Sequence, residues 1–458
     1  MRMQTRTFIA AGAVAGLAAA TVVTPAEAAT TTPSPRALAV ARQVLPAQDG
    51  WAAAGGGTTG GSAAEAAHIT VAHNRSELIA ALGGNNATNA RNATPKIVLV
   101  DGLIDANVDD ANMPLRCGDY AAPGYSLQQF LEAYDPAGPW GRVAPSGPLE
   151  DARVASARNQ SARVNINIGA NTTILGVNGA RITGANLLIQ GVSNVIIRNL
   201  TLTDAHDCFP SWSPTDGAAG NWNSLYDTLS VIGSTNVWVD HNQFSDGQND
   251  DDAQPVYFGR PYQVHDGLLD ITRAADLVTV SYNHMHDHDK AMLIGSSNTS
   301  VADVGRLRVT IHHNRFANLG QRVPRVRFGQ VDVYNNYYVA TDEDTFQYSW
   351  GAGVASSIYA ENNFFLRSAD IPLDAFVYDW SVPTNPARGA VTELGTKVRV
   401  GTGRIRDVSL VEAYNATHEP DLGPVTGWVP TLRPGIVTPT AAVPTVVMAR
   451  AGTGRLGV

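Results

Sequence analysis

The chain has 458 residues, of which 44% are hydrophobic and 16% are charged, and its formal net charge is −9. A chain of this length and apolar content can bury a large core, while the acidic balance excludes the generally basic surface of a nucleic-acid-binding protein. An anionic partner would therefore have to bind at a local group of basic side chains.

Residues 1–28 have the pattern of a secretory signal peptide. Arg2 and Arg6 precede an apolar run over residues 8–23, and small residues at 26–28 form a cleavage motif. The alternative is a membrane anchor, but the run is shorter than the roughly 20 apolar residues that a span requires and consists mostly of weakly apolar residues. We therefore predict a secreted, extracellular protein that does not associate with a membrane.

Composition divides the remaining chain into three parts. Residues 29–64 are rich in Ala, Gly, Thr and Pro, which predicts a low-complexity linker, and residues 430–458 resemble them and predict a C-terminal tail of low order. One large folded domain is expected over residues 65–429. Its first third contains three helical patterns, which begin near Ser76, Ser126 and Pro148.

Cys117 and Cys208 are the two cysteines of the chain, and both follow the predicted signal peptide. An oxidising compartment favours a disulfide between them, which would close a long loop and stabilise the fold by ~4–5 kcal/mol in the chain-entropy model. The alternative is a pair of buried free thiols. Two cysteines so far apart in sequence argue against a structural zinc site.

A repeat begins beyond residue 165, where short β-branched runs alternate with Gly, Asn and Asp. Five runs share one template that ends in asparagine, and such a repeat is typical of a parallel β-helix in which asparagines of neighbouring coils stack as a ladder. The left-handed backbone that Asn tolerates would suit the turn. A β-sandwich or propeller is the alternative, although the unequal spacing weighs against a propeller. The repeated asparagines are Asn242, Asn283, Asn314, Asn336 and Asn363.

Three aspartates are candidate metal ligands. Asp266 and Asp270 are four residues apart in a β-like run, so they share one face, and Asp227 begins a run that would belong to the preceding coil. Three carboxylates on one face suit a hard cation such as Ca²⁺. Spacing alone leaves open that they are separate, solvated surface acids.

Two basic residues occupy equivalent places one coil apart. Lys290 and Arg322 each follow a repeated asparagine by seven or eight residues, so we expect them to stack on the side of the carboxylates. A row of cations beside a Ca²⁺ site would suit a polyanionic sugar, but both side chains could also be ordinary surface charges. The run "HMHDHD" at residues 284–289 has the alternation of a transition-metal site, and a hydrogen-bonded turn is the favoured interpretation.

Several ordered motifs carry a family resemblance. They are "VWVDHNQFSDG", "HDGLLDI", "VTVSYNHMHDHDK", "VTIHHNRFAN", "QRVPRVRFGQV" and "VYNNYY", together with "FPSWSPTDGAAGNWNSLYD". From about residue 68 to about residue 420 the chain resembles the pectate lyases of polysaccharide lyase family 1, of the secreted bacterial type. The resemblance implies an all-β, right-handed parallel β-helix with a few short helices and long loops on one side. It also implies a monomer that cleaves α-1,4-polygalacturonate by Ca²⁺-dependent β-elimination and releases 4,5-unsaturated oligogalacturonates.

The resemblance also assigns roles by position. Asp227, Asp266 and Asp270 match primary Ca²⁺ ligands, and Asp216 matches a residue that helps to bind further Ca²⁺ with substrate. Arg322 matches the catalytic base, while Lys290 and Arg327 match catalytic residues that hold the substrate carboxylate. An arginine base implies an alkaline activity optimum, because arginine is normally protonated.

Asp332 stands where the family often has histidine, and we expect it to support structure. Arg325, between the two assigned arginines, receives no role from the resemblance and is expected to be structural or at the edge of the groove.

Three other functions are weighed against this one. A pectin lyase shares the fold but acts on methylated substrate without Ca²⁺, and the three aspartates argue against it. A β-helix glycoside hydrolase would use paired carboxylates and water, which leaves the lysine and arginines unexplained. A non-catalytic pectin-binding β-helix is the third alternative.

Overall fold

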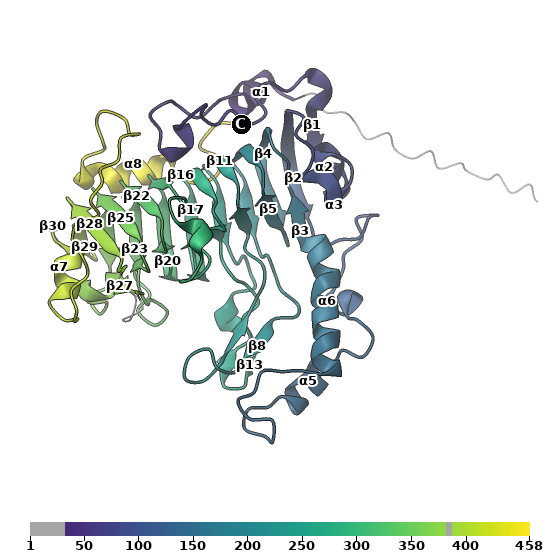
Figure 1. The fold of residues 1–458 in the computed structure, drawn as a ribbon. Coiled ribbons are helices and arrows are strands. Elements are labelled where there is room, and N and C mark those ends of the chain that lie inside the picture. The colour runs from purple at the N-terminus through teal and green to yellow at the C-terminus, as the bar shows by residue number, and fades with distance from the viewer. Residues whose placement is uncertain (1–32, 382–386) are drawn as a thin grey trace, which may run out of the picture. The chain divides into compact units, whose positions relative to one another are not determined.

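A computed structural model describes residues 33–381 and 387–458, which form one compact unit beginning at Pro33. The predicted signal peptide lies outside the described residues. Parallel strands stack in three ladders that wind around a common core, and this confirms the predicted parallel β-helix (Figure 1). Among the described residues, no helix is long and apolar enough to cross a membrane.

The first ladder is parallel and runs the length of the molecule. Its strands are β1 (Ile69–Ala72), β2 (Lys96–Asp105), β4 (Thr172–Thr183), β6 (Ser193–Arg198), β11 (Thr235–Asp240), β16 (Asp276–Ser281), β19 (Val309–His312), β22 (Gln330–Tyr334), β25 (Ser357–Glu361) and β28 (Ala390–Leu394).

The second ladder begins on the long strand β4 and closes with one antiparallel strand. Its further strands are β7 (Thr201–Thr203), β12 (Gln243–Ser245), β17 (His284–Lys290), β20 (Arg315–Gln321), β23 (Tyr337–Ala340), β26 (Phe364–Arg367), β29 (Lys397–Val400) and β30 (Arg406–Asp407).

The third ladder is a separate sheet of eight short parallel strands, and it carries most of the residues discussed below. These strands are β3 (Asn165–Asn167), β5 (Asn186–Gln190), β10 (Leu229–Ile232), β15 (Leu269–Thr272), β18 (Leu293–Ile294), β21 (Arg325–Val326), β24 (Trp350–Ala352) and β27 (Val377–Asp379).

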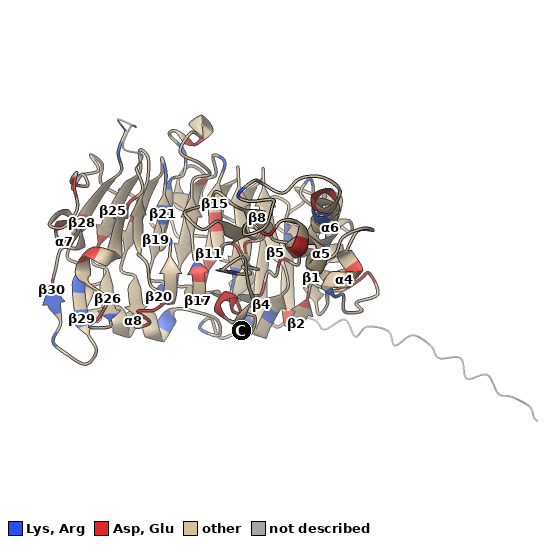
Figure 2. Ribbon diagram, turned by 90° about the horizontal axis from the view of Figure 1, so that it is seen from below, with Lys and Arg blue, Asp and Glu red and all other residues tan. Residues whose placement is uncertain are grey.

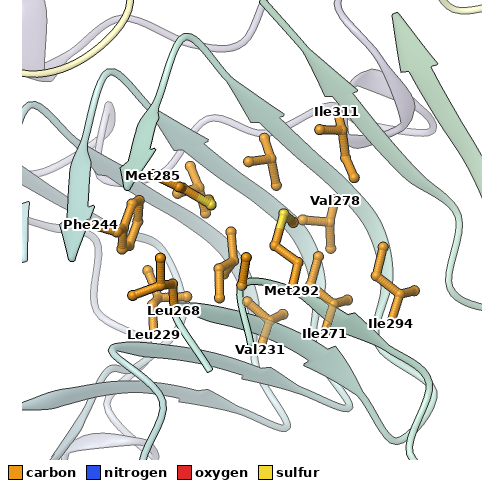
Figure 3. Close-up of a cluster of buried hydrophobic side chains, with 14 of the residues drawn as sticks. Leu229, Val231, Phe244, Leu268, Ile271, Val278, Met285, Met292, Ile294 and Ile311 are labelled. Atoms are coloured by element: carbon orange, nitrogen blue, oxygen red, sulfur yellow. The ribbon is translucent and has the colours of Figure 1, made fainter. Parts of the chain in front are cut away.

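The core consists of apolar side chains that stack from coil to coil. In the third ladder, for example, Val231, Ile271 and Ile294 are paired in register, and all three are fully buried (Figure 3). In the second ladder Phe244 pairs with Met285 in the same way. Each such side chain contributes about 1.5–3 kcal/mol by burial, so alternate residues of every strand hold neighbouring coils together.

The repeated asparagines form the predicted ladder. Their side-chain amides are fully buried and donate to the carbonyl oxygen of the next asparagine, with Nδ2–Oδ1 distances of 3.0–3.1 Å from Asn242 to Asn363. The expected left-handed backbone, however, belongs to the residue before each asparagine, such as Tyr282 with a φ of 54°. The asparagine itself is not the left-handed residue, because its buried amide must align with the ladder.

Helices connect the first strands of the β-helix, and two further helices pack near its C-terminal strands (Figure 1). The patterns near Ser126 and Pro148 correspond to α5 and α6, whereas the first helix is capped two residues earlier than expected, by Asn74, whose Oδ1 accepts from the Glu77 amide. The helices are α1 (Pro35–Ala41), α2 (Arg75–Leu82), α3 (Asn86–Asn89), α4 (Cys117–Tyr120), α5 (Leu127–Ala133), α6 (Pro148–Val164), α7 (Leu410–Asn415) and α8 (Val443–Arg450).

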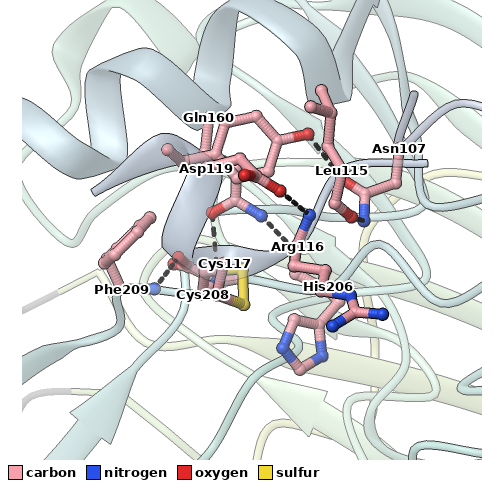
Figure 4. Close-up of a disulfide and its surroundings, with 11 residues drawn as sticks. Asn107, Leu115, Arg116, Cys117, Asp119, Gln160, His206, Cys208 and Phe209 are labelled. Carbon is pink, nitrogen blue, oxygen red and sulfur yellow. Dashed lines mark hydrogen bonds between the residues drawn. A yellow bond between two sulfur atoms is a disulfide. The ribbon is translucent and has the colours of Figure 1, made fainter. Parts of the chain in front are cut away.

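The disulfide between Cys117 and Cys208 is present and links α4 to the loop after β7 (Figure 4). Gln160 of α6 accepts from the Cys208 amide at 3.0 Å, so the same loop is also held by the longest helix. Two long connections leave the coils on this side, between β7 and β10 and between β12 and β15. They carry two hairpins, formed by β8 (Ser211–Ser213) with β9 (Asn221–Asn223) and by β13 (Val256–Tyr257) with β14 (Arg260–Pro261).

The described part of the predicted linker, residues 33–64, packs on the outer face of the first ladder instead of standing apart. The Trp51 amide donates to Thr310 Oγ1 at 3.0 Å, and the Gly61 amide donates to Thr173 Oγ1 at 2.9 Å. A Cβ atom added to Gly60 would lie 2.3 Å from Thr173 Oγ1. The glycines therefore permit close approach of two backbones, which composition alone does not distinguish from a flexible linker.

The predicted C-terminal tail is also ordered. Val443 and Val447 of α8 are fully buried against the second ladder, and Arg433 forms an ion pair with the buried Asp332. Asp332, the departure from the family pattern, thus anchors the C-terminal segment to β22.

Candidate active site

Asp227 and Asp270 meet around a glycine on the third ladder. Asp227 lies just before β10, and its Oδ1 accepts from the Gly267 amide at 3.0 Å, while Asp270 on β15 accepts from the Leu293 amide at 2.8 Å. A Cβ atom added to Gly267 would lie 2.6 Å from Asp270 Oδ1 and 2.8 Å from Asp227 Oδ1. Both oxygens therefore face one small space that only glycine leaves open, and oxygen donors of this kind suit a hard divalent cation.

The carboxylates repel one another. Burial, followed by the charge of Asp266, raises the pKa of Asp227 to about 7. Burial and the charge of Asp227 raise the pKa of Asp270 well above its usual range. Asp266 differs: burial opposes its ionisation, but the positive charges of Lys290 and Arg322 hold its pKa below the usual value. The cluster thus holds more negative charge than its neighbours neutralise, as a cation site would.

Lys290 lies at the edge of this cluster. Its Nζ is 3.0 Å from Asp266 Oδ1, and its side chain is only 8% exposed. The expected stack of Lys290 on Arg322 is wrong by one residue, because Lys290 of β17 pairs with Gln321 of β20. Arg322 follows at the corner between the second and third ladders.

Arg322 is the least restrained of the basic residues. Its backbone has a φ of 59°, and its Nε is buried without a hydrogen-bond partner. No side-chain hydrogen bond or ion pair joins it to another residue within 33–381 or 387–458. Its charge nevertheless acts on the carboxyl groups of Asp266 and Asp270. A guanidinium that is close to carboxylates but not locked by them is free to meet a substrate.

The corner at residues 322–325 places the arginines of this segment in different positions. β20 ends at Gln321 and β21 begins at Arg325, so the chain passes from one ladder to the next between them. Arg327 Nε donates to Asn298 Oδ1 at 2.9 Å and its Nη1 donates to the Gly295 carbonyl at 3.0 Å. Burial and the charge of Arg322 lower the pKa of Arg327. Figure 2 shows a basic position on β21 and an acidic position on β15, and β18 lies between these two strands in the sheet.

Asp216 is not brought to this cluster by any hydrogen bond or ion pair between described residues. It is exposed at the turn of the β8–β9 hairpin. The histidines of "HMHDHD" do not converge either: His284 and His286 stack on each other, with ring centroids 4.4 Å apart, while His288 is buried and bonds elsewhere.

A buried network behind Asp266 was not predicted from the sequence. His288 Nδ1 is 2.7 Å from Asp246 Oδ1, and its Nε2 is 2.9 Å from the Asp266 carbonyl. His265 lies between Asp204 and Asp251, at 3.0 and 3.1 Å. Burial lowers the pKa of His265, but these hydrogen bonds outweigh it and raise the value to about 10. The network fixes the backbone that carries Asp266, and its sequence signal was the alternation of His and Asp at residues 284–289.

Comparison with known proteins gives consistent matches. A family model described as pectate lyase matches residues 146–382. A pectate lyase of Bacillus subtilis (strain 168) is 43% identical over 418 residues, which are 90% of this chain and 94% of that protein. A solved structure of a thermostable pectate lyase has a TM-score of 0.88 at 46% identity, covering 91% of this chain and 99% of its own. A pectate lyase bound to a hexasaccharide has a TM-score of 0.83 at 41% identity, covering 91% and 99%.

Proposed function

Because this chain belongs to the pectate lyase family and is a polysaccharide lyase, we propose that it is a secreted, Ca²⁺-dependent enzyme acting on polygalacturonate. The products would be 4,5-unsaturated oligogalacturonates. The observation that carries the proposal is the position of Arg322 at the ladder corner, where its guanidinium has no hydrogen bond to another described residue and acts on the carboxyl groups of Asp266 and Asp270.

Asp227, Asp266 and Asp270 would hold Ca²⁺. The donor set consists of carboxylate oxygens, and the space left by Gly267 is where two of them already face each other. When bound, the cation would neutralise the substrate carboxylate and stabilise negative charge that develops on it. Asp216, on its exposed hairpin, would contribute to a further Ca²⁺ site that forms with substrate.

Arg322 would act as the base. In its neutral guanidine form it removes the proton from C5 of the sugar, which is α to the C6 carboxylate, and becomes a guanidinium, while the electron pair of that C–H bond forms the C4–C5 double bond. The bond from C4 to the glycosidic oxygen breaks at the same time, and the leaving sugar takes a proton from solvent. No water is added across the cleaved bond. Beyond binding of the carboxylate, the reaction therefore requires only a proton acceptor at C5 and a proton for the leaving oxygen.

Lys290 and Arg327 would hold the substrate carboxylate. Lys290 is already positioned by Asp266, and Arg327 is positioned by Asn298 and the Gly295 carbonyl, so little side-chain entropy is lost when they bind substrate. Their positive charges lower the energy of the carbanion-like transition state, in which negative charge spreads onto the carboxylate.

The predicted secretion is supported by the pattern of residues 1–28 and by the disulfide, which forms in oxidising compartments. Polygalacturonate as substrate is supported by the hexasaccharide-bound relative and by the local cationic groups on an acidic chain. We propose a monomer on the family resemblance alone.

The test is an incubation with polygalacturonate in Ca²⁺ and, separately, in a chelator. The proposal expects ultraviolet absorbance from unsaturated product in Ca²⁺ only. New reducing ends without absorbance would indicate hydrolysis, product in the presence of chelator would indicate a pectin-lyase type of site, and binding without either signal would indicate a non-catalytic protein.

A further inference from the structure

A histidine that the proposed chemistry does not use lies beside the disulfide. Figure 4 shows the ring of His206 next to the bond between Cys117 and Cys208, in the loop after β7. Its Nδ1 is buried and has no hydrogen-bond partner among the described residues. Because both sulfur atoms belong to the disulfide, no thiolate is available to bind a metal together with His206, and any further ligands must come from other residues.

Asp204 and His265 supply two such donors. One ring nitrogen of His206, one ring nitrogen of His265 and one carboxylate oxygen of Asp204 all lie within 4.8 Å of one another. Asp204 Oδ1 is 3.0 Å from His265 Nε2, and the centroids of the two imidazole rings are 6.0 Å apart. Ligand atoms at about 2.0–2.1 Å from a tetrahedral Zn²⁺ lie about 3.3 Å from one another, so movements of up to about 1.5 Å would place all three around one ion.

This donor set favours a transition metal over Ca²⁺. Two imidazole nitrogens and one carboxylate oxygen are typical ligands of Zn²⁺, whereas Ca²⁺ takes oxygen ligands. Three protein ligands leave a fourth tetrahedral position for water, and the side chain of Asp204, which is 22% exposed, gives the ion access from solvent. The donors therefore differ in kind from the carboxylate cluster of the candidate active site, which offers only oxygen.

The groups around His265 already have the arrangement that orients a metal-binding histidine. His265 Nδ1 is 3.1 Å from Asp251 Oδ1 and 3.7 Å from Asp246 Oδ2, so carboxylates hold the ring with its Nε2 towards Asp204. A carboxylate on the second ring nitrogen is the usual outer partner of a histidine ligand. Asp204 is held in turn, because its Oδ2 accepts from Asn249 Nδ2 at 2.6 Å while its Oδ1 faces the histidine.

Binding would exchange one proton for the ion. Burial and the charge of His265 lower the pKa of His206, so this ring is neutral at pH 7 and needs to lose no proton. His265 would release the proton that Nε2 shares with Asp204 and would keep the proton on Nδ1, which Asp251 accepts. Asp246 Oδ2 and Asp251 Oδ2 are buried without hydrogen-bond partners among the described residues. Three carboxylates thus surround His265 with more acceptor oxygens than donors, and this excess suits a dication in place of one proton.

We propose that Asp204, His206 and His265 form a Zn²⁺ site, separate from the Ca²⁺ site of the proposed function. The ion would join the loop after β7, which carries Asp204 and His206, to the segment before β15, which carries His265. Because His265 directly precedes Asp266, the ion would also hold the chain that enters the carboxylate cluster. Zn²⁺ binding does not depend on pectate lyase activity, so the site can be tested independently of the proposed function.

The test is a calorimetric titration of the full chain with Zn²⁺ in excess Ca²⁺. Wild-type protein should bind one Zn²⁺ and should denature at a higher temperature when Zn²⁺ is present. His206→Leu and Asp204→Asn should each weaken Zn²⁺ binding by at least about 100-fold, because loss of an outer partner alone costs about 10- to 100-fold. His68→Leu replaces an exposed histidine outside the site and should bind Zn²⁺ as wild-type protein does. Co²⁺ in place of Zn²⁺ should give the strong visible absorbance of a tetrahedral site in wild-type protein and not in His206→Leu.

Absence of Zn²⁺ binding by wild-type protein, or equal binding by wild-type protein and His206→Leu, would overturn the site. Asp270→Asn distinguishes it from the carboxylate cluster. This variant should bind Zn²⁺ normally, and loss of Zn²⁺ binding would mean that the ion occupies the carboxylate cluster instead. Thermal denaturation in a chelator shows whether each variant is folded, and if His206→Leu is not, Asp204→Asn provides the same comparison.

Discussion

Replacing Asp270 with asparagine should make the protein more stable than wild-type protein without Ca²⁺ and less stable than wild-type protein with Ca²⁺. Asparagine has nearly the same shape, and its Oδ1 can still accept from the Leu293 amide, which Asp270 does at 2.8 Å. The change therefore removes one negative charge with little loss of packing. Because the pKa of Asp270 is raised in the folded state, its ionisation opposes folding. This penalty grows as pH rises above the usual carboxyl range and is fully present once pH exceeds the raised value.

The magnitude follows from the charges that meet around Gly267. Two unit charges about 5 Å apart at an effective dielectric of about 20 repel by about 3 kcal/mol, and solvent reduces this further. We expect the free energy of unfolding of Asp270→Asn to exceed that of wild-type protein by about 1 kcal/mol at pH 8 in a chelator. In Ca²⁺ the order should reverse, because at a Ca²⁺ concentration of 100 Kd wild-type protein gains about 2.7 kcal/mol, whereas a variant that binds Ca²⁺ about 30-fold more weakly gains only about 0.9 kcal/mol.

Thermal denaturation of both proteins, with and without Ca²⁺, measures this reversal, and calorimetry should show Ca²⁺ binding weakened by at least about 30-fold. Asp407→Asn is the matched control, since Asp407 is an exposed acid on β30 that pairs with Lys397, and it should leave the Ca²⁺ response unchanged. If Asp270→Asn responded to Ca²⁺ as wild-type protein does, Asp270 would not be a ligand and the reasoning would be refuted.

Four further outcomes are expected. Arg322→Gln should lower kcat by about 10²- to 10⁴-fold while calorimetric Ca²⁺ affinity does not fall, and a parallel loss of affinity would argue against a role as base. Asn314→Ala leaves buried amide groups of the ladder unpaired, so urea denaturation should show a loss of about 2–3 kcal/mol, and an unchanged midpoint would mean that the ladder does not stabilise the coils. Replacing Cys117 and Cys208 with serine should cost up to ~4–5 kcal/mol in thermal denaturation yet preserve activity below the transition, because no hydrogen bond between described residues joins either cysteine to Asp227, Asp266 or Asp270; loss of activity in folded protein would contradict this. Burial and the charge of His312 lower the pKa of His313 to about 2. Below pH 6.5 only the unfolded state therefore binds this proton, so the free energy of unfolding falls by about 1.4 kcal/mol for each unit by which the pH is lowered. His313→Gln should remove that part of the slope between pH 4 and 6, and an unaltered slope in denaturation curves would show that His313 does not cause it.

The fold could be predicted because its repeat is local. Each coil repeats one pattern of apolar residues and one asparagine, so a comparison of short segments was sufficient to predict the β-helix. The pattern did not determine which residue of one coil pairs with which residue of the next beyond the turns. Lys290 follows Asn283 by seven residues, whereas Arg322 follows Asn314 by eight. Because β17 and β20 pair in constant register, Lys290 pairs with Gln321 and Arg322 lies one residue further on, at the corner.

Composition was less informative than periodicity. The glycine-rich segment before residue 65 has the composition of a flexible linker, but Gly60 is there because no side chain would fit against Thr173. Similarly, the network around His265 joins Asp204 and Asp251, which lie on different loops, and no spacing along the chain brings them together. Contacts of this kind arise from the long connections, whose paths the repeat does not determine.

The direct test of the proposed chemistry is to cleave polygalacturonate in oxygen-18 water with Ca²⁺ present and to measure the masses of the products by mass spectrometry. Elimination initiated by Arg322 adds no water across the cleaved bond. The account therefore predicts one unsaturated product end per cleavage, of mass lower by one water, with no oxygen-18 introduced by cleavage and no cleavage in a chelator. New non-reducing ends that are saturated, or cleavage that persists in the chelator, would contradict it.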